Sequence, residues 1–183
     1  MVRGTLTVVV FLFASSALLA EDDFKREGTG EKRTQKDALE NKAPPELAVK
    51  GWINTDGKDL QLSDLRGKVV VMDFWGVWCG PCRQAMPHLK ELLAKHREDG
   101  LAVVGIHTTS RGDQMADFVK EQELPWPVAV DVDRKTVTAF RVDSYPDYYI
   151  IDRAGKLRVA DLQNGDLDRV VELLLKEKAP PAP

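Results

Sequence analysis

The chain has 183 residues and a net charge of −3, from 26 lysines and arginines against 29 aspartates and glutamates. This weakly acidic balance includes no basic patch, which argues against nucleic acid as a partner. The chain also has only 2 cysteines, whereas a structural zinc site needs about four protein ligands.

The first 20 residues have the pattern of a secretory signal. Arg3 is followed by an uncharged, mostly apolar run over residues 5–20, which is shorter than the roughly 20 apolar residues of a comfortable membrane span. Small residues at Ser15 and Ala17 allow cleavage after Ala17, and Ala20 allows a later cut; an uncleaved anchor is the alternative. We therefore expect a secreted or periplasmic protein, which an uncleaved anchor would tether to the outer face of the inner membrane.

Residues 21–42 are rich in charges of both signs, and their apolar side chains are Phe24, Ala38 and Leu39 alone. Such a segment buries too little apolar surface to fold by itself, so we predict a disordered spacer. Residues 179–183 read Ala-Pro-Pro-Ala-Pro and are predicted to form a flexible tail, because proline cannot continue a helix. Residues 43–178 then form one domain of sufficient length for its own core.

The first elements of this domain are a hairpin and a buried strand. Short apolar segments flank the turn signal Thr55-Asp56-Gly57 between residues 47 and 62, which favours an N-terminal hairpin. The near-continuous apolar run from Lys68 to Trp75 is typical of a strand buried on both faces of a parallel sheet. We predict that this strand is central.

The next segment is predicted to be a helix over residues 81–99. Its apolar residues recur at helical spacing, at Met86, Leu89 and Leu93, and Gly100 follows its end. Pro87 lies inside this helix and should bend it.

The remaining pattern alternates between strands and helices. We predict a strand at 101–107, a helix at 113–123, a strand at 127–131, a short helix at 133–140, a hairpin of 147–152 with 156–162, and a helix at 166–178. This order indicates an α/β fold with a mixed sheet.

Both cysteines lie in the sequence Cys79-Gly80-Pro81-Cys82, where the buried strand should turn into the helix. Two thiols at this spacing can close a small disulfide. Unpaired backbone N–H groups and the helix dipole favour the thiolate of Cys79 and lower its pKa. We expect Cys79 to face outward as the nucleophile, and Cys82 to be more buried and to resolve a mixed disulfide.

Three other uses of the cysteine pair are disfavoured. So short a loop would restrain the unfolded chain too little to serve as a structural staple. A zinc site lacks a second cysteine pair, and the three histidines, which we expect to pack in the core or at the surface, lack paired spacing: His88, His96 and His107. Covalent haem attachment needs histidine where this chain has Arg83. We therefore expect no metal and no cofactor besides a redox-active Cys79–Cys82 disulfide.

Asp73 is a carboxylate inside the apolar run of the predicted central strand. Burial there should raise its pKa, because a low dielectric disfavours the charged form. The alternative is an aspartate near a strand end that reaches solvent.

Together these motifs resemble the thioredoxin superfamily, and within it the secreted TlpA-like and ResA-like thiol-disulfide oxidoreductases, which have a redoxin or AhpC/TSA-like domain. The resemblance covers residues 43–178 and rests on residues 67–82, Pro87, Tyr145-Pro146 and residues 149–155. It implies a thioredoxin fold: a central mixed sheet flanked by helices, with an N-terminal hairpin and an inserted helix–strand element at 113–131.

The resemblance also implies a substrate groove. Pro146 would be a cis-proline opposite the disulfide, and Tyr145 would offer its backbone to an extended substrate strand. Trp78, Gly80 and Pro81 would line the same groove.

The resemblance assigns Asp73 to proton exchange with Cys82 through water. The chain departs from the family pattern at Ala85, where many relatives have glutamate, and in the strand at 101–107, which has no lysine to pair with Asp73. It also departs at Asp147, where threonine is common. We expect a negative charge at Asp147 to oppose the thiolate and to disfavour acidic substrates.

These features predict a secreted reductase of protein disulfides. The resemblance suggests periplasmic substrates such as apocytochrome c, and a membrane electron donor. The Gly-Pro pair favours reduction, while oxidation and isomerisation remain alternatives. Two other functions also remain: a thiol-dependent peroxidase, although Met72 and Gly76 replace the Pro and Thr of the PxxxTxxC motif, and a non-catalytic binding domain.

Overall fold

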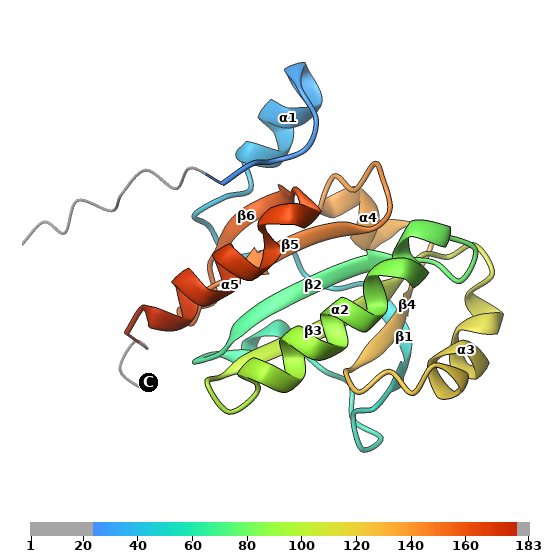
Figure 1. The fold of residues 1–183 in the computed structure, drawn as a ribbon. Coiled ribbons are helices and arrows are strands. Elements are labelled where there is room, and N and C mark those ends of the chain that lie inside the picture. The colour runs from blue at the N-terminus through green and yellow to red at the C-terminus, as the bar shows by residue number, and fades with distance from the viewer. Residues whose placement is uncertain (1–23, 179–183) are drawn as a thin grey trace, which may run out of the picture.

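The structure is a computed structural model that describes residues 24–178 (Figure 1). The predicted signal over residues 1–20 and the predicted tail over residues 179–183 lie outside the described residues. Within residues 24–178, no helix has both the length and the hydropathy to cross a membrane.

A six-stranded sheet forms the centre of the fold, in the order β1-β4-β3-β2-β5-β6. Its strands are β1 Val49–Ile53, β2 Val69–Trp75, β3 Leu101–His107, β4 Val128–Asp131, β5 Asp147–Ile151 and β6 Leu157–Leu162. β2, β3 and β4 run parallel to one another, whereas β1, β5 and β6 pair antiparallel with their neighbours. The mixed sheet and the α/β class are as predicted.

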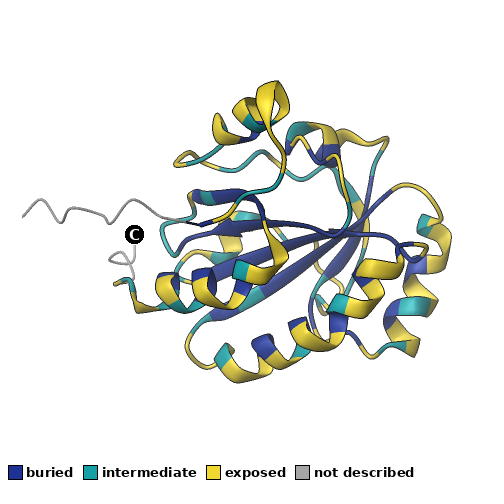
Figure 2. Cartoon of the chain, turned by 45° about the horizontal axis from the view of Figure 1, so that its top comes forward, coloured by how far each residue is buried: buried dark blue, intermediate teal, exposed yellow. Residues whose placement is uncertain are grey.

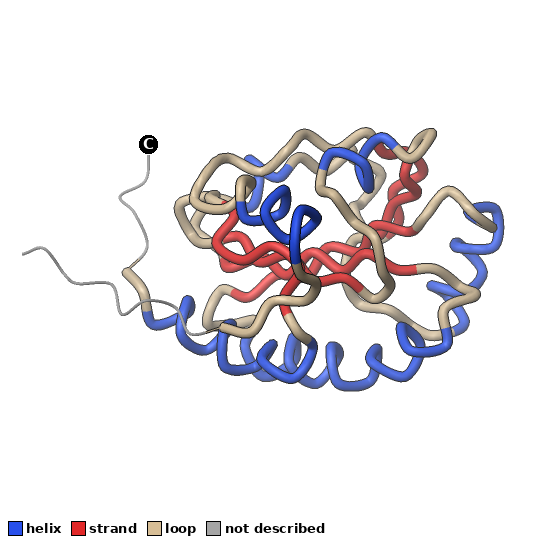
Figure 3. The backbone as a smooth tube through the Cα atoms, turned by 90° about the horizontal axis from the view of Figure 1, so that it is seen from above, coloured by secondary structure: helices blue, strands red, loops and turns tan. Residues whose placement is uncertain are grey.

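Helices cover both faces of the sheet. They are α1 Gly30–Asp37, α2 Gly80–His96, α3 Met115–Glu121, α4 Lys135–Ala139 and α5 Leu167–Lys176, and 3-10 turns occur at Leu62–Leu65, Gly112–Gln114 and Asn164–Asp166. α2, α3 and α5 contribute to one apolar core and α4 to the other, and in Figures 1 and 3 α2 and α5 lie together on one side of the sheet.

β2 is the central strand, as predicted, and lies between β3 and β5. All seven of its residues are buried, and Figure 2 shows the inner strands in dark blue beneath helices whose outer faces are exposed. Val71 and Trp75 belong to the core under α2 and α5, whereas Val70 and Phe74 belong to the opposite core. Because side chains alternate along a strand, burial on both faces requires an apolar residue at almost every position.

The predicted N-terminal hairpin is wrong. β1 forms, but it pairs antiparallel with β4, with Val49 opposite Asp131. After β1, the Asn54 side chain donates hydrogen bonds to the carbonyls of Leu124 and Trp126 at 2.7 and 2.9 Å. β1 therefore finds its partner at the open edge of β4, and no second strand forms beside it between residues 54 and 62.

The predicted disordered spacer is also wrong over its described part, residues 24–42. This segment contains α1 and forms β-bridges from Arg26 to Leu162 and from Lys42 to Leu157, at the end and start of β6. Phe24 is buried against the core. Several of its charged side chains bond to the domain, which anchors the segment: Lys32, Arg33, Lys36 and Glu40.

This packing predicts that the segment contributes to stability. Phe24 is 6% exposed, and the Arg169 guanidinium lies 5.5 Å from the centre of its ring. Phe24→Ala should lower the free energy of unfolding by about 3 kcal/mol, measured by urea denaturation, because it leaves a cavity. Thr29→Ala is the control, since Thr29 is exposed and its side chain makes no capping hydrogen bond. Equal stability of both variants would mean that the segment does not pack in solution.

Candidate active site

The two cysteines form a disulfide at the start of α2, with their Cα atoms 5.3 Å apart. Cys79 is the residue that precedes the helix, and its Sγ accepts a hydrogen bond from the Cys82 backbone N–H at 3.1 Å. Pro81 lies in the first turn, where its missing N–H removes no helical hydrogen bond. The Sγ of Cys79 is thus held at the positive end of the helix dipole.

Cys79 does not face outward as expected. In the disulfide form Cys79 is 4% exposed and Cys82 is 2% exposed, and both belong to the core under α2. The exposed residues at this point are Trp78, Gly80 and Pro81. The neighbouring residues, rather than the two sulfurs, therefore form the exposed surface of this site.

The peptide bond between Tyr145 and Pro146 is cis, which confirms that prediction. Because β2 and β5 are antiparallel, with Phe74 opposite Asp147, the end of β2 and the start of β5 meet at one edge of the sheet. The Tyr145 ring lies edge-on to the Trp78 indole, with ring centres 5.6 Å apart. The structure thus brings together two of the predicted groove residues from distant parts of the chain.

Asp73 is buried, with 3% exposure. It lies in the middle of β2, opposite Tyr148 of β5 and Gly105 of β3, and alternation along the strand turns it toward α2, the helix of Cys82. Its Oδ1 has no hydrogen-bond partner, and burial raises the pKa of its carboxyl to about 7. The solvent-exposed alternative is therefore excluded.

His107 has a structural role that the sequence did not reveal. Its Nε2 accepts a hydrogen bond from the Val77 backbone N–H at 3.0 Å, and its Nδ1 lies 2.6 Å from the Thr108 carbonyl oxygen. An N–H donor on one side and a carbonyl on the other require a neutral ring that is protonated on Nδ1. Burial lowers the pKa of His107 and preserves this state. The ring therefore holds the backbone just before Trp78. In the sequence, the one indication of this role was the position of His107 at the end of β3, the strand beside β2.

The expectation for Asp147 is wrong. Asp147 is fully buried near Lys36 and Asp161, and burial followed by the nearby Asp161 charge raises the pKa of its carboxyl to about 9. Its neighbours Tyr148 and Tyr149 pack in opposite cores, with Tyr148 on the α2 side. Alternation along β5 therefore turns Asp147 away from the disulfide, and the protonated carboxyl has no negative charge to oppose a thiolate.

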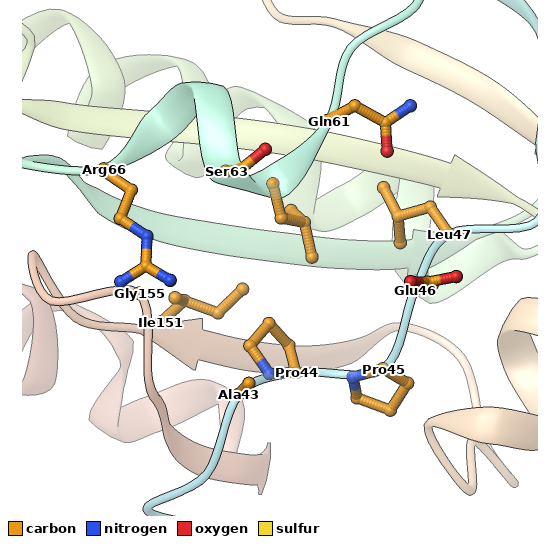
Figure 4. A pocket seen from close by; sticks show the side chains of 11 residues that line it. Ala43, Pro44, Pro45, Glu46, Leu47, Gln61, Ser63, Arg66, Ile151 and Gly155 are labelled. Carbon is orange, nitrogen blue, oxygen red and sulfur yellow. The ribbon is translucent and has the colours of Figure 1, made fainter.

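A separate pocket is lined by other residues (Figure 4). Its lining comes from the segment before β1, the 3-10 turn before β2 and the turn between β5 and β6: residues 43–47, 61–63, 66, 151 and 155. Neither cysteine contributes to it, and its side chains include no nucleophilic thiol. The candidate active site is therefore the surface formed by Trp78 and Tyr145 over the disulfide.

Comparison with known proteins agrees with this geometry. Residues 39–160 match the model of the AhpC/TSA family. The chain belongs to this family. It is 36% identical over 102 residues to the thiol-disulfide oxidoreductase ResA of a Bacillus cereus strain, covering 56% of this chain and 59% of that protein.

A second ResA, from Bacillus thuringiensis subsp. konkukian, is 31% identical over 125 residues, which cover 68% of this chain and 72% of the relative. A solved thioredoxin-like superfamily protein, SPOA0173, superposes with a TM-score of 0.64 at 32% identity, over 76% of this chain and 99% of that one. The chain is thus a ResA-like member of the thioredoxin superfamily, in a branch whose named relatives are thiol-disulfide oxidoreductases. The resemblance and the thioredoxin fold are confirmed, apart from the N-terminal hairpin.

The buried state of Asp73 predicts a pH dependence of stability. Its carboxyl has a pKa near 3.9 in the unfolded chain and about 7 in the folded protein. The folded protein therefore holds the extra proton in this window, so the stability that Asp73 contributes is complete below about pH 4 and is lost as the pH rises through about 7.

Asp73→Asn should remove this loss and raise the free energy of unfolding of the oxidised protein at about pH 8 by on the order of 2 kcal/mol, with little change at about pH 4. Urea denaturation at both pH values measures it. The control is Asp59→Asn, at an exposed position. A stability of Asp73→Asn that stays parallel to wild type over the whole range would contradict the raised pKa.

Proposed function

We propose that this ResA-like protein is an extracytoplasmic reductase of protein disulfides. The observation that carries the proposal is the combination, at one edge of the sheet, of a disulfide at a helix N-terminus, a cis-proline loop and a buried acid on the strand beneath. The secretory pattern of residues 1–20 supports export, with cleavage or anchoring as the two outcomes.

The first step is the attack of the reduced Cys79 thiolate on one sulfur of a substrate disulfide. A mixed disulfide forms between Cys79 and the substrate, and the second substrate sulfur leaves as a thiolate that takes up a proton. The Cys82 N–H that bonds Cys79 Sγ in the disulfide, together with the helix dipole, would stabilise the attacking thiolate.

In the second step Cys82 attacks the Cys79 sulfur and releases the substrate as a dithiol. Cys82 must first lose its proton, and a carboxylate with a pKa of about 7 can accept it at neutral pH. We assign this role to Asp73, acting through water. Two electrons pass to the substrate, the Cys79–Cys82 disulfide re-forms, and a membrane electron donor would reduce it again. The thiol pair needs no other cofactor.

The substrate would bind as an extended strand. The backbone of Tyr145 beside cis-Pro146 can pair with a peptide by β-strand addition, and the rings of Trp78 and Tyr145 offer an apolar surface. Trp78 is 43% exposed, which suits contact with a polypeptide partner. Gly80 and Pro81 are exposed beside it.

Trapping tests the division of roles between the two cysteines. Cys82→Ser should accumulate mixed disulfides with protein substrates through Cys79, because the resolving thiol is absent, whereas Cys79→Ser should trap few. Non-reducing gels with mass spectrometry detect these species. The wild-type protein should reduce insulin disulfides and consume hydrogen peroxide slowly. Fast peroxide turnover at Cys79 would favour the peroxidase instead, and trapping by both variants to the same extent would reverse the cysteine roles.

The role of Asp73 predicts a selective kinetic defect. Asp73→Asn should form the mixed disulfide within about twofold of the wild-type rate, because Cys79 makes that attack, but should release product about 10²-fold more slowly at neutral pH. Rapid-quench measurements with a dye-labelled peptide disulfide separate the two steps. Release at the wild-type rate would exclude Asp73 as the proton acceptor.

A further inference from the structure

A lysine is buried in the part of the fold that precedes β1. Lys36, in the last turn of α1, is 2% exposed. Its Nζ lies 2.5 Å from Asp143 Oδ1, 2.5 Å from Asp161 Oδ2 and 3.6 Å from Asp147 Oδ2. Burial alone would lower the pKa of Lys36, but the hydrogen bonds with the Asp143 and Asp161 carboxylates raise it.

Two of these three acids flank the cis-proline loop. Asp143 lies three residues before Pro146, and Asp147 follows it directly at the start of β5. The third acid, Asp161, belongs to the neighbouring strand β6. One ammonium group thus contacts both ends of the loop that contains Tyr145 and links them to the sheet.

The acids that contact Lys36 also have other cationic partners. Lys32 Nζ lies 3.2 Å from Asp143 Oδ2, and Arg33 Nη1 lies 3.8 Å from Asp161 Oδ2. Arg33 also pairs with Asp37 and Glu40 of its own segment. The third acid, Asp147, keeps its proton at neutral pH, since burial and then Asp161 raise its pKa to about 9. A buried ion cluster is tolerated only when its charges are compensated in this way.

The three carboxylates also have the spacing of metal ligands, with one oxygen from each lying within 4.8 Å of the others. The ammonium of Lys36, which reaches all three, already supplies the positive charge that a metal ion would bring. We therefore assign the cluster to the lysine.

We propose that Lys36 is a positioning residue for substrate binding: from α1 it holds the Tyr145-Pro146 loop in the conformation that pairs with a substrate strand. The inference rests on the proposed function and extends it to the N-terminal segment. Figure 1 shows α1 beside β6 and apart from α2, the helix that begins at the cysteines. Lys36 would therefore affect binding of a polypeptide without touching it or the sulfur atoms.

The test compares two substrates in the full-length protein. Lys36→Met should raise KM for insulin about tenfold, because a small displacement of the loop weakens backbone pairing, while kcat stays within about twofold. Reduction of a small disulfide, hydroxyethyl disulfide, should be unchanged within about twofold, since it is too short to pair with the loop. Amide hydrogen exchange at residues 144–148 should become faster, and exchange around Cys79 should not.

Two further variants make the result specific. Lys42→Met is the matched control, because the Lys42 ammonium bonds the Ala38 carbonyl within its own segment at 2.8 Å; its KM for insulin should equal that of wild type. Asp143→Asn weakens one link at a partly exposed position and should raise KM about threefold, which provides a readout if Lys36→Met does not fold.

Unchanged KM for insulin in both Lys36→Met and Asp143→Asn would overturn the inference. An equal loss of activity on insulin and on the small disulfide would also overturn it, because the defect would then lie at the cysteines. If wild-type protein fails to reduce insulin, the proposed function fails, and amide exchange alone decides the inference: faster exchange confined to the loop in Lys36→Met supports it, and unchanged exchange rejects it.

Discussion

The site depends on the burial of β2 on both faces. A strand that is covered by α2 and α5 on one side and by a second apolar core on the other cannot slide or rotate without exposing large side chains. Its end is therefore a fixed point, and the chain turns there into α2. The end of β2 therefore fixes where the following residues lie: the exposed Trp78, the disulfide and the first N–H groups of α2.

The same burial gives Asp73 its chemistry. In the middle of β2 the carboxyl is surrounded by strands on both sides and by a helix above, and burial is the cause of its raised pKa. A lysine partner would stabilise the carboxylate and lower the pKa. One strand thus provides both a rigid support for the disulfide and the buried surroundings that raise the pKa of Asp73.

Much of this arrangement follows from local sequence. The β2 run, the Cys79-Gly80-Pro81-Cys82 turn and the helical spacing after it are short-range patterns, and they predict the structure well. The errors concern long-range partners: β1 pairs with β4, and Lys36 bonds acids 107 and 125 residues away. A charged segment looks disordered when its partners are unknown. The expectation that Asp147 faces the thiolate failed for a related reason. The face of β5 on which Asp147 lies is set by the packing of Tyr148 and Tyr149 in opposite cores.

The fold of residues 24–42 has a consequence for the sheet itself. β6 is an outer strand, and an outer strand with free backbone groups is a template for pairing with other chains. The bridges from Arg26 to Leu162 and from Lys42 to Leu157 place this protein's own backbone on that edge. Under the proposed function, the polypeptide substrates would include extended strands that could pair with such an edge. The N-terminal segment bridges to this edge at Leu162 and Leu157, so the proposed strand addition at the Tyr145-Pro146 loop would face less competition from β6.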